Sequence, residues 1–357
     1  MNEGPPTSVS TTTKQTNTSR KVKNPSGAGG KTTVRTVSGQ LLARYAMVIV
    51  FGVVFASFAL TLPGLFLTVG NFKSMLSSQV VPLLLCVGVT MTLRLGDLDL
   101  SFAANANFCA MILAILTTRS HANIVVALII AAAVGCAVGL VNALFIVGFG
   151  LNGFIVTLGT MTVLTGVTAG LADNQVVTNI PTAVTNFATS QLFGLPLDVY
   201  YGWIVALAVW IVYDLTPFGR YLLFAGGNRD GARLIGIRVA RIRVICYAVS
   251  GLIFGLAGIT LLGSLGAADP SVANQYLLPP LAGAFVGLTT IQIGRFNIPG
   301  SILGLYLLLL ISTGIQLAGA ASWLGTVLDG AALVAAIGFA RLIQGSGGAN
   351  HVRNPGI

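Results

Sequence analysis

Beyond residue 44, the chain alternates between long apolar runs and short polar segments. A helix of about 20 apolar residues is long enough to cross a hydrocarbon core of about 30 Å. The pattern therefore predicts an all-α polytopic membrane protein with about ten transmembrane helices, the third and sixth of them short. The apolar blocks lie at roughly 45–69, 76–93, 100–116, 122–148, 151–172, 201–213, 242–266, 273–292, 299–318 and 322–340.

The composition agrees with this pattern. Of the 357 residues, 55% are hydrophobic and only 8% are charged, with a mean hydropathy of +0.88. Soluble domains carry about 25% charged residues. The composition therefore excludes an ordinary soluble domain.

The positions of Lys and Arg indicate an orientation. If the first segment is cytoplasmic, alternation of ten helices places all but Lys73 and Arg119 of the 19 basic residues on the cytoplasmic side. This predicts cytoplasmic N- and C-termini, with a transmembrane domain at 45–342 between tails at 1–44 and 343–357. The net charge of +10 is then mostly positive-inside charge, and we expect no nucleic-acid partner.

The first 44 residues are interpreted as a disordered basic tail. They are rich in Ser, Thr, Gly and Lys, and they lack the apolar core of a secretory signal. The segment GAGGKTT at 27–33 resembles a phosphate-binding loop, but Pro25 occupies the position of a required glycine. No flanking strand or helix is indicated either. We therefore expect no ATPase site and no cofactor in this chain.

A basic polar island at 214–243 interrupts the apolar blocks, with the sequence DLTPFGRYLLFAGGNRDGARLIGIRVARIR. Its six arginines are balanced only by Asp214 and Asp230. A short helix is predicted within it, because Asn228 is a suitable N-cap, Asp230 suits a first turn and Gly236 suits a helix end. A large basic cytoplasmic loop of this kind predicts a surface for a partner.

A second polar segment, GDLDLS at 96–101, begins the third apolar block. Asp97 is expected to be solvated near the inner boundary, whereas Asp99 lies deeper and needs a partner such as Arg94 or a helix N-terminus. Two interpretations stand side by side: a polar lining for a translocation pathway, or a capped, broken helix start. The pathway candidates are Asp99, Ser101, Asn105, Asn152, Thr157 and Thr160.

The fifth block is unusually polar. Asn152 is expected to cap a helix after the turn at Gly150. The threonines could line a cavity or bond their own backbone carbonyls, and for each threonine alone the backbone bond is the simpler interpretation.

Other residue patterns indicate packing rather than chemistry. Glycines four residues apart let membrane helices approach closely. The four cysteines lie inside apolar blocks without metal-ligand spacing, and no nucleophile–base pair or histidine cluster occurs, so we expect neither a metal site nor an enzyme. The glycine pairs are Gly135/Gly139, Gly251/Gly255 and Gly300/Gly304.

Three of these segments, taken in order, resemble the permease subunits of binding-protein-dependent ABC importers of the ribose, xylose and galactoside type. GDLDLS at 96–101 resembles G-G-I-D-L-S of that family. NGFIVTLGT at 152–160 resembles N-P-F-I-x-T-L-G-T, and 219–237 resembles its G-R-x-x-x-A-x-G-x-N-x-x-A-A-R-x-x-G-I loop. The likeness covers about residues 45–342. Asp97, Gly153 and Thr165 depart from the family pattern, as does the glycine-poor segment at 286–295.

The resemblance implies that a separate ABC ATPase binds the cytoplasmic loop and that an external binding protein delivers substrate. The Asn228–Gly236 segment would be a coupling helix, with Arg220, Arg229 and Arg233 facing acidic residues of the ATPase or serving only as positive-inside anchors. The loop at 173–200 would dock the binding protein, or be a plain connector. The coupling residues implied are Arg220, Gly226, Gly227, Asn228, Ala232, Arg233, Leu234 and Gly236.

The expected function is therefore that of a permease subunit in the inner membrane, working as a homodimer or pseudo-symmetric heterodimer and importing a monosaccharide. Three alternatives remain open at this point. The chain could carry another solute, such as a nucleoside, a branched-chain amino acid or a quorum signal. It could be a secondary transporter that uses Asp99 for ion coupling, or a membrane scaffold or receptor component.

Overall fold

The structure is a computed structural model that describes Gly4 and residues 33–347, with side-chain surroundings for residues 46–338. Residues 27–32 of the segment resembling a phosphate-binding loop and most of both predicted tails lie outside these residues. The chain divides into an N-terminal unit, Met1–Gln40, and a larger unit, Leu41–Ile357.

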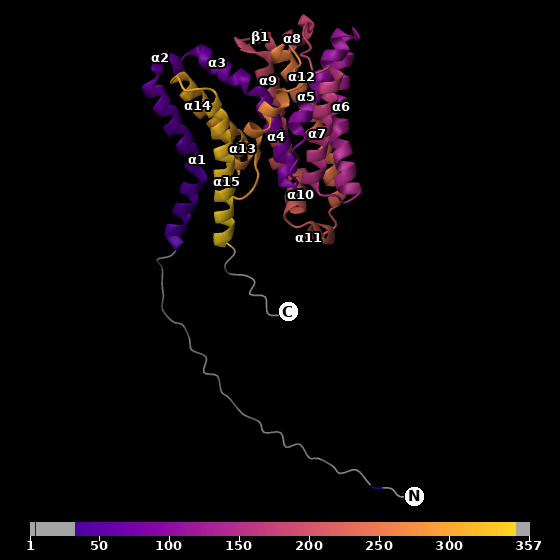
Figure 1. Cartoon of the computed structure of the whole chain (residues 1–357). Coiled ribbons are helices and arrows are strands. Elements are labelled where there is room, and N and C mark those ends of the chain that lie inside the picture. Colours follow the sequence, from indigo (N-terminus) through magenta and orange to yellow (C-terminus); the bar gives the residue numbers. More distant parts are fainter. Residues whose placement is uncertain (1–3, 5–32, 348–357) are drawn as a thin grey trace. The chain divides into compact units, whose positions relative to one another are not determined.

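The described residues form an almost entirely helical structure, as the sequence predicts (Figure 1). Helix α1 begins at Thr33, so the last part of the predicted tail is helical. The elements are α1 (Thr33–Thr61), α2 (Pro63–Phe66), α3 (Val69–Ser78), α4 (Val80–Arg94), α5 (Phe102–Thr118), α6 (Ile124–Ala143), η1 (Leu144–Gly148), α7 (Gly153–Leu171), α8 (Thr182–Thr189), β1 (Gln191–Leu192), β2 (Leu195–Pro196), α9 (Leu197–Trp210), η2 (Ile211–Leu215), α10 (Pro217–Gly227), α11 (Arg229–Leu234), α12 (Val239–Leu265), η3 (Val272–Tyr276), α13 (Leu278–Gly287), α14 (Ile298–Leu317) and α15 (Trp323–Gly347).

Each of the ten apolar blocks contains helix, but not every helix is long enough to cross a bilayer. Among the described residues, five helices have the length and composition of a span, and a sixth is added if α3 and α4, bent by 41°, form one span. Helix α13 has only ten residues, which is about 15 Å of rise. Its length therefore covers about half of a hydrocarbon core of about 30 Å.

Asparagine side chains begin four of the helices. Asn123, Asn152, Asn228 and Asn297 each accept a hydrogen bond from a backbone N–H in the first turn of the helix that follows. Such a cap satisfies donors that would otherwise lack a partner at a helix N-terminus. The caps on α7 and α11 are the two that the sequence predicts.

Helix α12 is the central packing element, in contact with α4, α5 and α6. Its contact with α6 runs through the predicted glycine pairs. A Cβ atom added at Gly135 would lie 2.5 Å from the Gly251 carbonyl oxygen, and one at Gly139 would lie 2.1 Å from the Tyr247 carbonyl oxygen. The pair Gly300/Gly304 likewise brings α14 against the backbone of α13. All three glycine pairs are therefore confirmed as packing sites.

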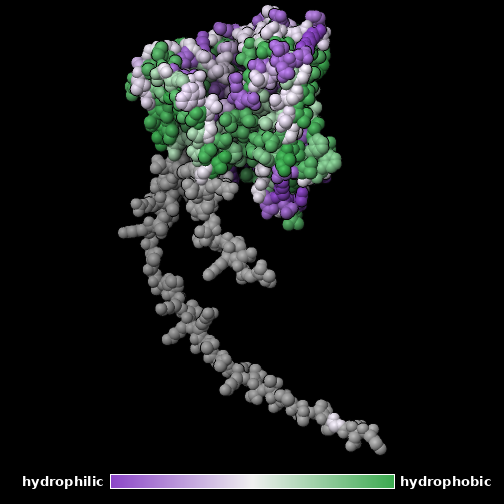
Figure 2. Space-filling model, in the orientation of Figure 1, coloured by the Kyte–Doolittle hydropathy of each residue, from purple (hydrophilic) through white to green (hydrophobic). Residues whose placement is uncertain are grey.

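The interior of the larger unit is built around α4, in which every residue from Val80 to Leu93 is buried. Hydrophobic residues cover much of the visible face between hydrophilic ends (Figure 2). The hairpin β1–β2 and α8 lie at one end, and α10 and α11 lie at the other, where α15 also ends (Figure 1). The basic loop and the predicted external loop are therefore at opposite ends of the helices.

Candidate functional site: the basic loop and the break between α4 and α5

The basic island folds into α10, α11 and the start of α12, with the predicted short helix at the predicted place. The Gly231 N–H donates to the Asn228 side-chain oxygen at 2.8 Å, which caps α11. Asp230 lies in the first turn, and Gly236 follows the helix with φ +83°. The structure confirms these local predictions. They could be made from the sequence because each depends only on neighbouring residues.

The side of α11 that faces away from the protein is accessible. Leu234 is 89% exposed, and Arg233 forms an exposed ion pair with Asp230 at 3.2 Å. Ala232, in contrast, is buried, and Arg220 is exposed on α10. One side of α11 therefore packs against the protein through Ala232. The other side exposes a basic residue, Arg233, and an apolar one, Leu234.

Gly226 holds the end of α10 against the end of α4. A Cβ atom added at Gly226 would lie 1.9 Å from the Arg94 carbonyl oxygen, whereas one at Gly227 would meet nothing within 4 Å. Of the two adjacent glycines, only Gly226 is required by close backbone approach.

A buried ionic cluster joins the basic loop to the break between α4 and α5. The Asp97 carboxylate, which is 6% exposed, accepts three hydrogen bonds from Arg243 at 2.8–3.1 Å. Arg229 Nη2 donates to the same carboxylate at 2.8 Å and to the Leu95 carbonyl at 3.3 Å. Charge-assisted bidentate contacts of this kind are strong and directional.

The sequence prediction for Asp97 is wrong, because the residue is buried rather than solvated and pairs with two arginines from the basic loop. Of the two partners expected for Asp99, Arg94 is not the one found. It pairs with Asp214 at 3.4 Å and lies 4.0 Å from the centre of the Tyr213 ring.

Asp99 is held by the start of α5 instead. Its carboxylate accepts hydrogen bonds from the backbone N–H and the hydroxyl of Ser101, at 2.8 and 2.7 Å. The Asn142 amide donates to the Ser101 hydroxyl, and Thr160 donates to the Asn142 oxygen at 2.7 Å. A chain of polar side chains therefore crosses from the helix break through α6 to α7.

The remaining pathway candidates have separate roles. Thr157 accepts from the Leu100 N–H at 3.1 Å and donates to the Leu98 carbonyl at 3.2 Å, so it also holds the helix break. Asn105 donates to the Gly135 carbonyl between α5 and α6, and Asn152 caps α7. Asp99, Ser101, Thr157 and Thr160 form one network at the helix break, and the side chains of the other two candidates make separate contacts.

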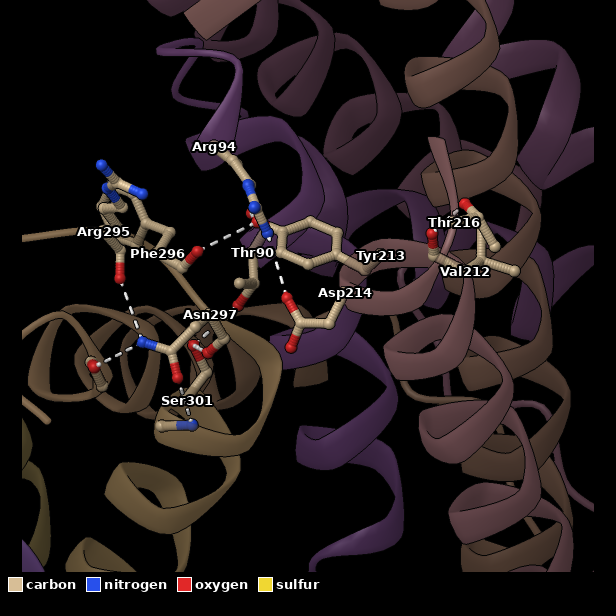
Figure 3. A network of polar contacts seen from close by, with 12 residues as sticks. Thr90, Arg94, Val212, Tyr213, Asp214, Thr216, Arg295, Phe296, Asn297 and Ser301 are labelled. Atoms are coloured by element: carbon tan, nitrogen blue, oxygen red, sulfur yellow. Dashed lines mark hydrogen bonds and ion pairs between the residues drawn. The ribbon is translucent and has the colours of Figure 1, made fainter. Parts of the chain in front are cut away.

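A second network fixes the end of α4 that lies beside the basic loop (Figure 3). The Tyr213 hydroxyl contacts the carbonyls of Thr90 and Phe296, at 3.3 and 3.2 Å. Asn297 caps α14 and donates to the Arg295 carbonyl, while Ser301 accepts from the Thr90 hydroxyl at 3.1 Å. The network ties α4, η2 and α14 together.

Comparison with known proteins places the chain in a family. Residues 71–337 match the family described as branched-chain amino acid transport system, permease component. The chain belongs to this permease family.

Individual relatives are similar to the permease over most of its chain. It is 28% identical to the D-allose transport system permease protein of Escherichia coli (strain K12), over 84% of this chain and 92% of that protein. It is 29% identical to the ribose import permease protein of the same organism, over 78% and 87%. An autoinducer 2 import system permease protein of Photorhabdus laumondii is 28% identical over 71% and 79%.

The permease also has a polar end opposite the basic loop. Asp173, Asn174, Asn179 and Asn186 are exposed there, as the sequence suggests for a docking surface. Asp198, near the end of the same predicted loop 173–200, is instead 1% exposed and accepts from Ser264 at 3.2 Å, because it belongs to the first turn of α9.

Sequence reasoning missed three residues of the site. Apart from Asn123 at its start, Asn142 is the only asparagine of the apolar block at 122–148. Its role in a polar contact could therefore have been suspected from the sequence. The roles of Asp97 and Arg243 have no local signal, because these two partners are more than a hundred residues apart. Within the described residues, no three His, Cys, Asp or Glu side chains come together as a possible metal site.

Proposed function

We propose that this chain is the transmembrane permease subunit of an ATP-driven ABC importer that forms the pathway for a monosaccharide. The observation that carries the proposal is α11, a capped helix with Leu234 89% exposed, inside a chain of the permease family. An exposed leucine beside arginines suits a groove with an apolar floor and an acidic rim. An ABC ATPase would bind the ATP and supply that groove.

The proposal includes an arrangement in the bacterial inner membrane. Ten spans with cytoplasmic N- and C-termini would put α11 at the ATPase side, in line with the basic residues of 214–243. The exposed residues of 173–200 would face an external substrate-binding protein. A second permease copy or homologue would complete a dimer with two ATPases.

The substrate class is proposed from two relatives, whose names describe ribose and D-allose transport. The family description concerns branched-chain amino acids, and another relative is described for autoinducer 2. Ribose and D-allose are therefore the first substrates to test, and a branched-chain amino acid is the natural control.

Co-purification with ABC ATPases of ribose-type importers tests the proposal. We expect wild type to retain ATPase in detergent and Leu234→Asp to lose at least about tenfold, because a charge replaces a buried apolar contact. Arg233→Glu should weaken the complex in the same direction.

The matched control is Phe193→Asp, which introduces the same charge at a residue 93% exposed in the β1–β2 hairpin, at the opposite end. It should leave ATPase binding unchanged. Equal retention by wild type, Leu234→Asp and Arg233→Glu would contradict the proposal, provided that all three proteins elute as folded species.

A further inference from the structure

The helix break at 95–101 lies between two sets of contacts. On one side, Arg229 from α11 reaches Asp97 and the Leu95 carbonyl. On the other, Asp99 and Ser101 connect through Asn142 to Thr160. The segment is therefore attached both to the loop proposed to face the ATPase and to the polar side chains proposed for the pathway.

The Arg229 contact is not needed to neutralise Asp97. Arg243 already does so, with three hydrogen bonds and a side chain only 12% exposed. Arg229 is 39% exposed and adds a second charge to a carboxylate that is already paired. Because Asp97 is already neutralised by Arg243, the additional contact from Arg229 suggests that Arg229 positions segment 95–101 rather than stabilises the fold.

The position of Arg229 also links α11 to segment 95–101. It is the first residue of α11, directly after the Asn228 cap, so its backbone moves with that helix. Its Nη2 atom lies 2.8 Å from the Asp97 carboxylate and 3.3 Å from the Leu95 carbonyl. A shift of α11 by more than about 1 Å would break these hydrogen bonds or displace the segment.

We propose that Arg229 and Asp97 are positioning residues that transmit movement of α11 to segment 95–101 and so couple ATP hydrolysis to opening of the pathway. The inference rests on the proposed function and identifies the contact through which it operates. Arg243 also binds Asp97 to α12, so a shift of α11 relative to α12 would act on Asp97 and on the segment that carries it.

The test compares Arg229→Gln with Arg241→Gln, a matched control that removes an arginine from the same basic segment, 214–243. The Arg241 side chain lies on α12 and is exposed. The complex with ATPase and binding protein is placed in proteoliposomes, and uptake of labelled ribose or D-allose is measured together with ATP hydrolysis.

We expect Arg229→Gln to assemble and hydrolyse ATP but to transport about tenfold less sugar per ATP, a typical magnitude for coupling between two sites. Arg241→Gln should keep the wild-type ratio, and Arg229→Lys should restore part of it because it retains the charge. An unchanged ratio of sugar to ATP in Arg229→Gln overturns the inference. A lower ratio that is explained by a lower melting temperature of this variant overturns it as well.

A second measurement does not depend on the substrate. The substitution Leu98→Cys is made in a variant without the native cysteines. The rate at which a maleimide labels this cysteine then measures how accessible segment 95–101 is. In the assembled complex, a non-hydrolysable ATP analogue should change this rate at least about threefold when Arg229 is present, and it should leave the rate unchanged in the Arg229→Gln background. Equal changes in both backgrounds overturn the inference, whereas failure of wild type to bind any ATPase removes the proposed function and this inference with it.

Discussion

At the residue scale, the permease pairs its buried charges with partners that are distant in sequence. Asp97 is paired with Arg243 and Arg229, and Arg94 with Asp214. An unpaired charge in a membrane interior is costly, so the pairs of Asp97 with Arg243 and of Arg94 with Asp214 are needed for the fold. Asp99 is held by hydrogen bonds from Ser101 alone among the described contacts.

Two adjacent glycines allow a direct test of the packing between α10 and α4. Gly226→Ala should destabilise the protein by about 1–3 kcal/mol, because its Cβ would lie 1.9 Å from the Arg94 carbonyl oxygen. Gly227→Ala, with nothing within 4 Å, should be neutral or slightly stabilising. Thermal unfolding in detergent measures both, and equal melting temperatures would contradict the packing described here.

The difference between local and distant contacts explains what the sequence could predict. The Asn228 cap and the end of α11 near Gly236 depend on residues within one turn, so both were predictable. The pairing of Asp97 with Arg243 was not, because six arginines of 214–243 are equivalent in sequence and only folding selects two of them.

At the element scale, glycine contacts determine how closely α6 and α12 pack. Adding even one methyl group at Gly139 would drive it into the Tyr247 carbonyl, 2.1 Å away. In a membrane, close packing of this kind replaces the hydrophobic driving force that associates helices in water. The contact between α6 and α12 is therefore a main source of stability.

Gly139→Ala should accordingly lower stability by about 1–3 kcal/mol, since neither backbone can move aside without separating the helices. The matched control is Gly159→Ala on α7, where the added methyl group meets nothing within 4 Å. Unfolding in a graded series of denaturing detergent compares the two variants. A larger loss for Gly159→Ala than for Gly139→Ala would show that α6 and α12 do not pack this closely.

The apolar blocks predicted where the helices lie, but not which helices cross the membrane completely and which are buried inside the protein. Helix α4 is buried from Val80 to Leu93, and α13 has only ten residues. Both appear in sequence as ordinary apolar blocks, because hydropathy reports burial without distinguishing lipid from protein. The number of complete spans therefore could not be read from the blocks alone.

At the scale of the whole molecule, the permease has two polar ends, and the helix break at 95–101 lies against α10 and α11 of the basic end. The basic end presents α11, and the opposite end presents the exposed residues of 173–200 (Figure 1). The break at 95–101 connects α11 to α5, α6 and α7. This connection makes an ATP-driven mechanism physically reasonable, and a gradient-driven transporter using Asp99 is the alternative that must be separated from it.

The most direct test of the proposed function is uptake of labelled ribose and D-allose into proteoliposomes that contain the permease with its ATPase and binding protein. We expect uptake that requires ATP hydrolysis and all three components, and that persists when proton and sodium gradients are collapsed. Uptake by the permease alone that follows an ion gradient and ignores ATP would contradict an ATP-driven importer.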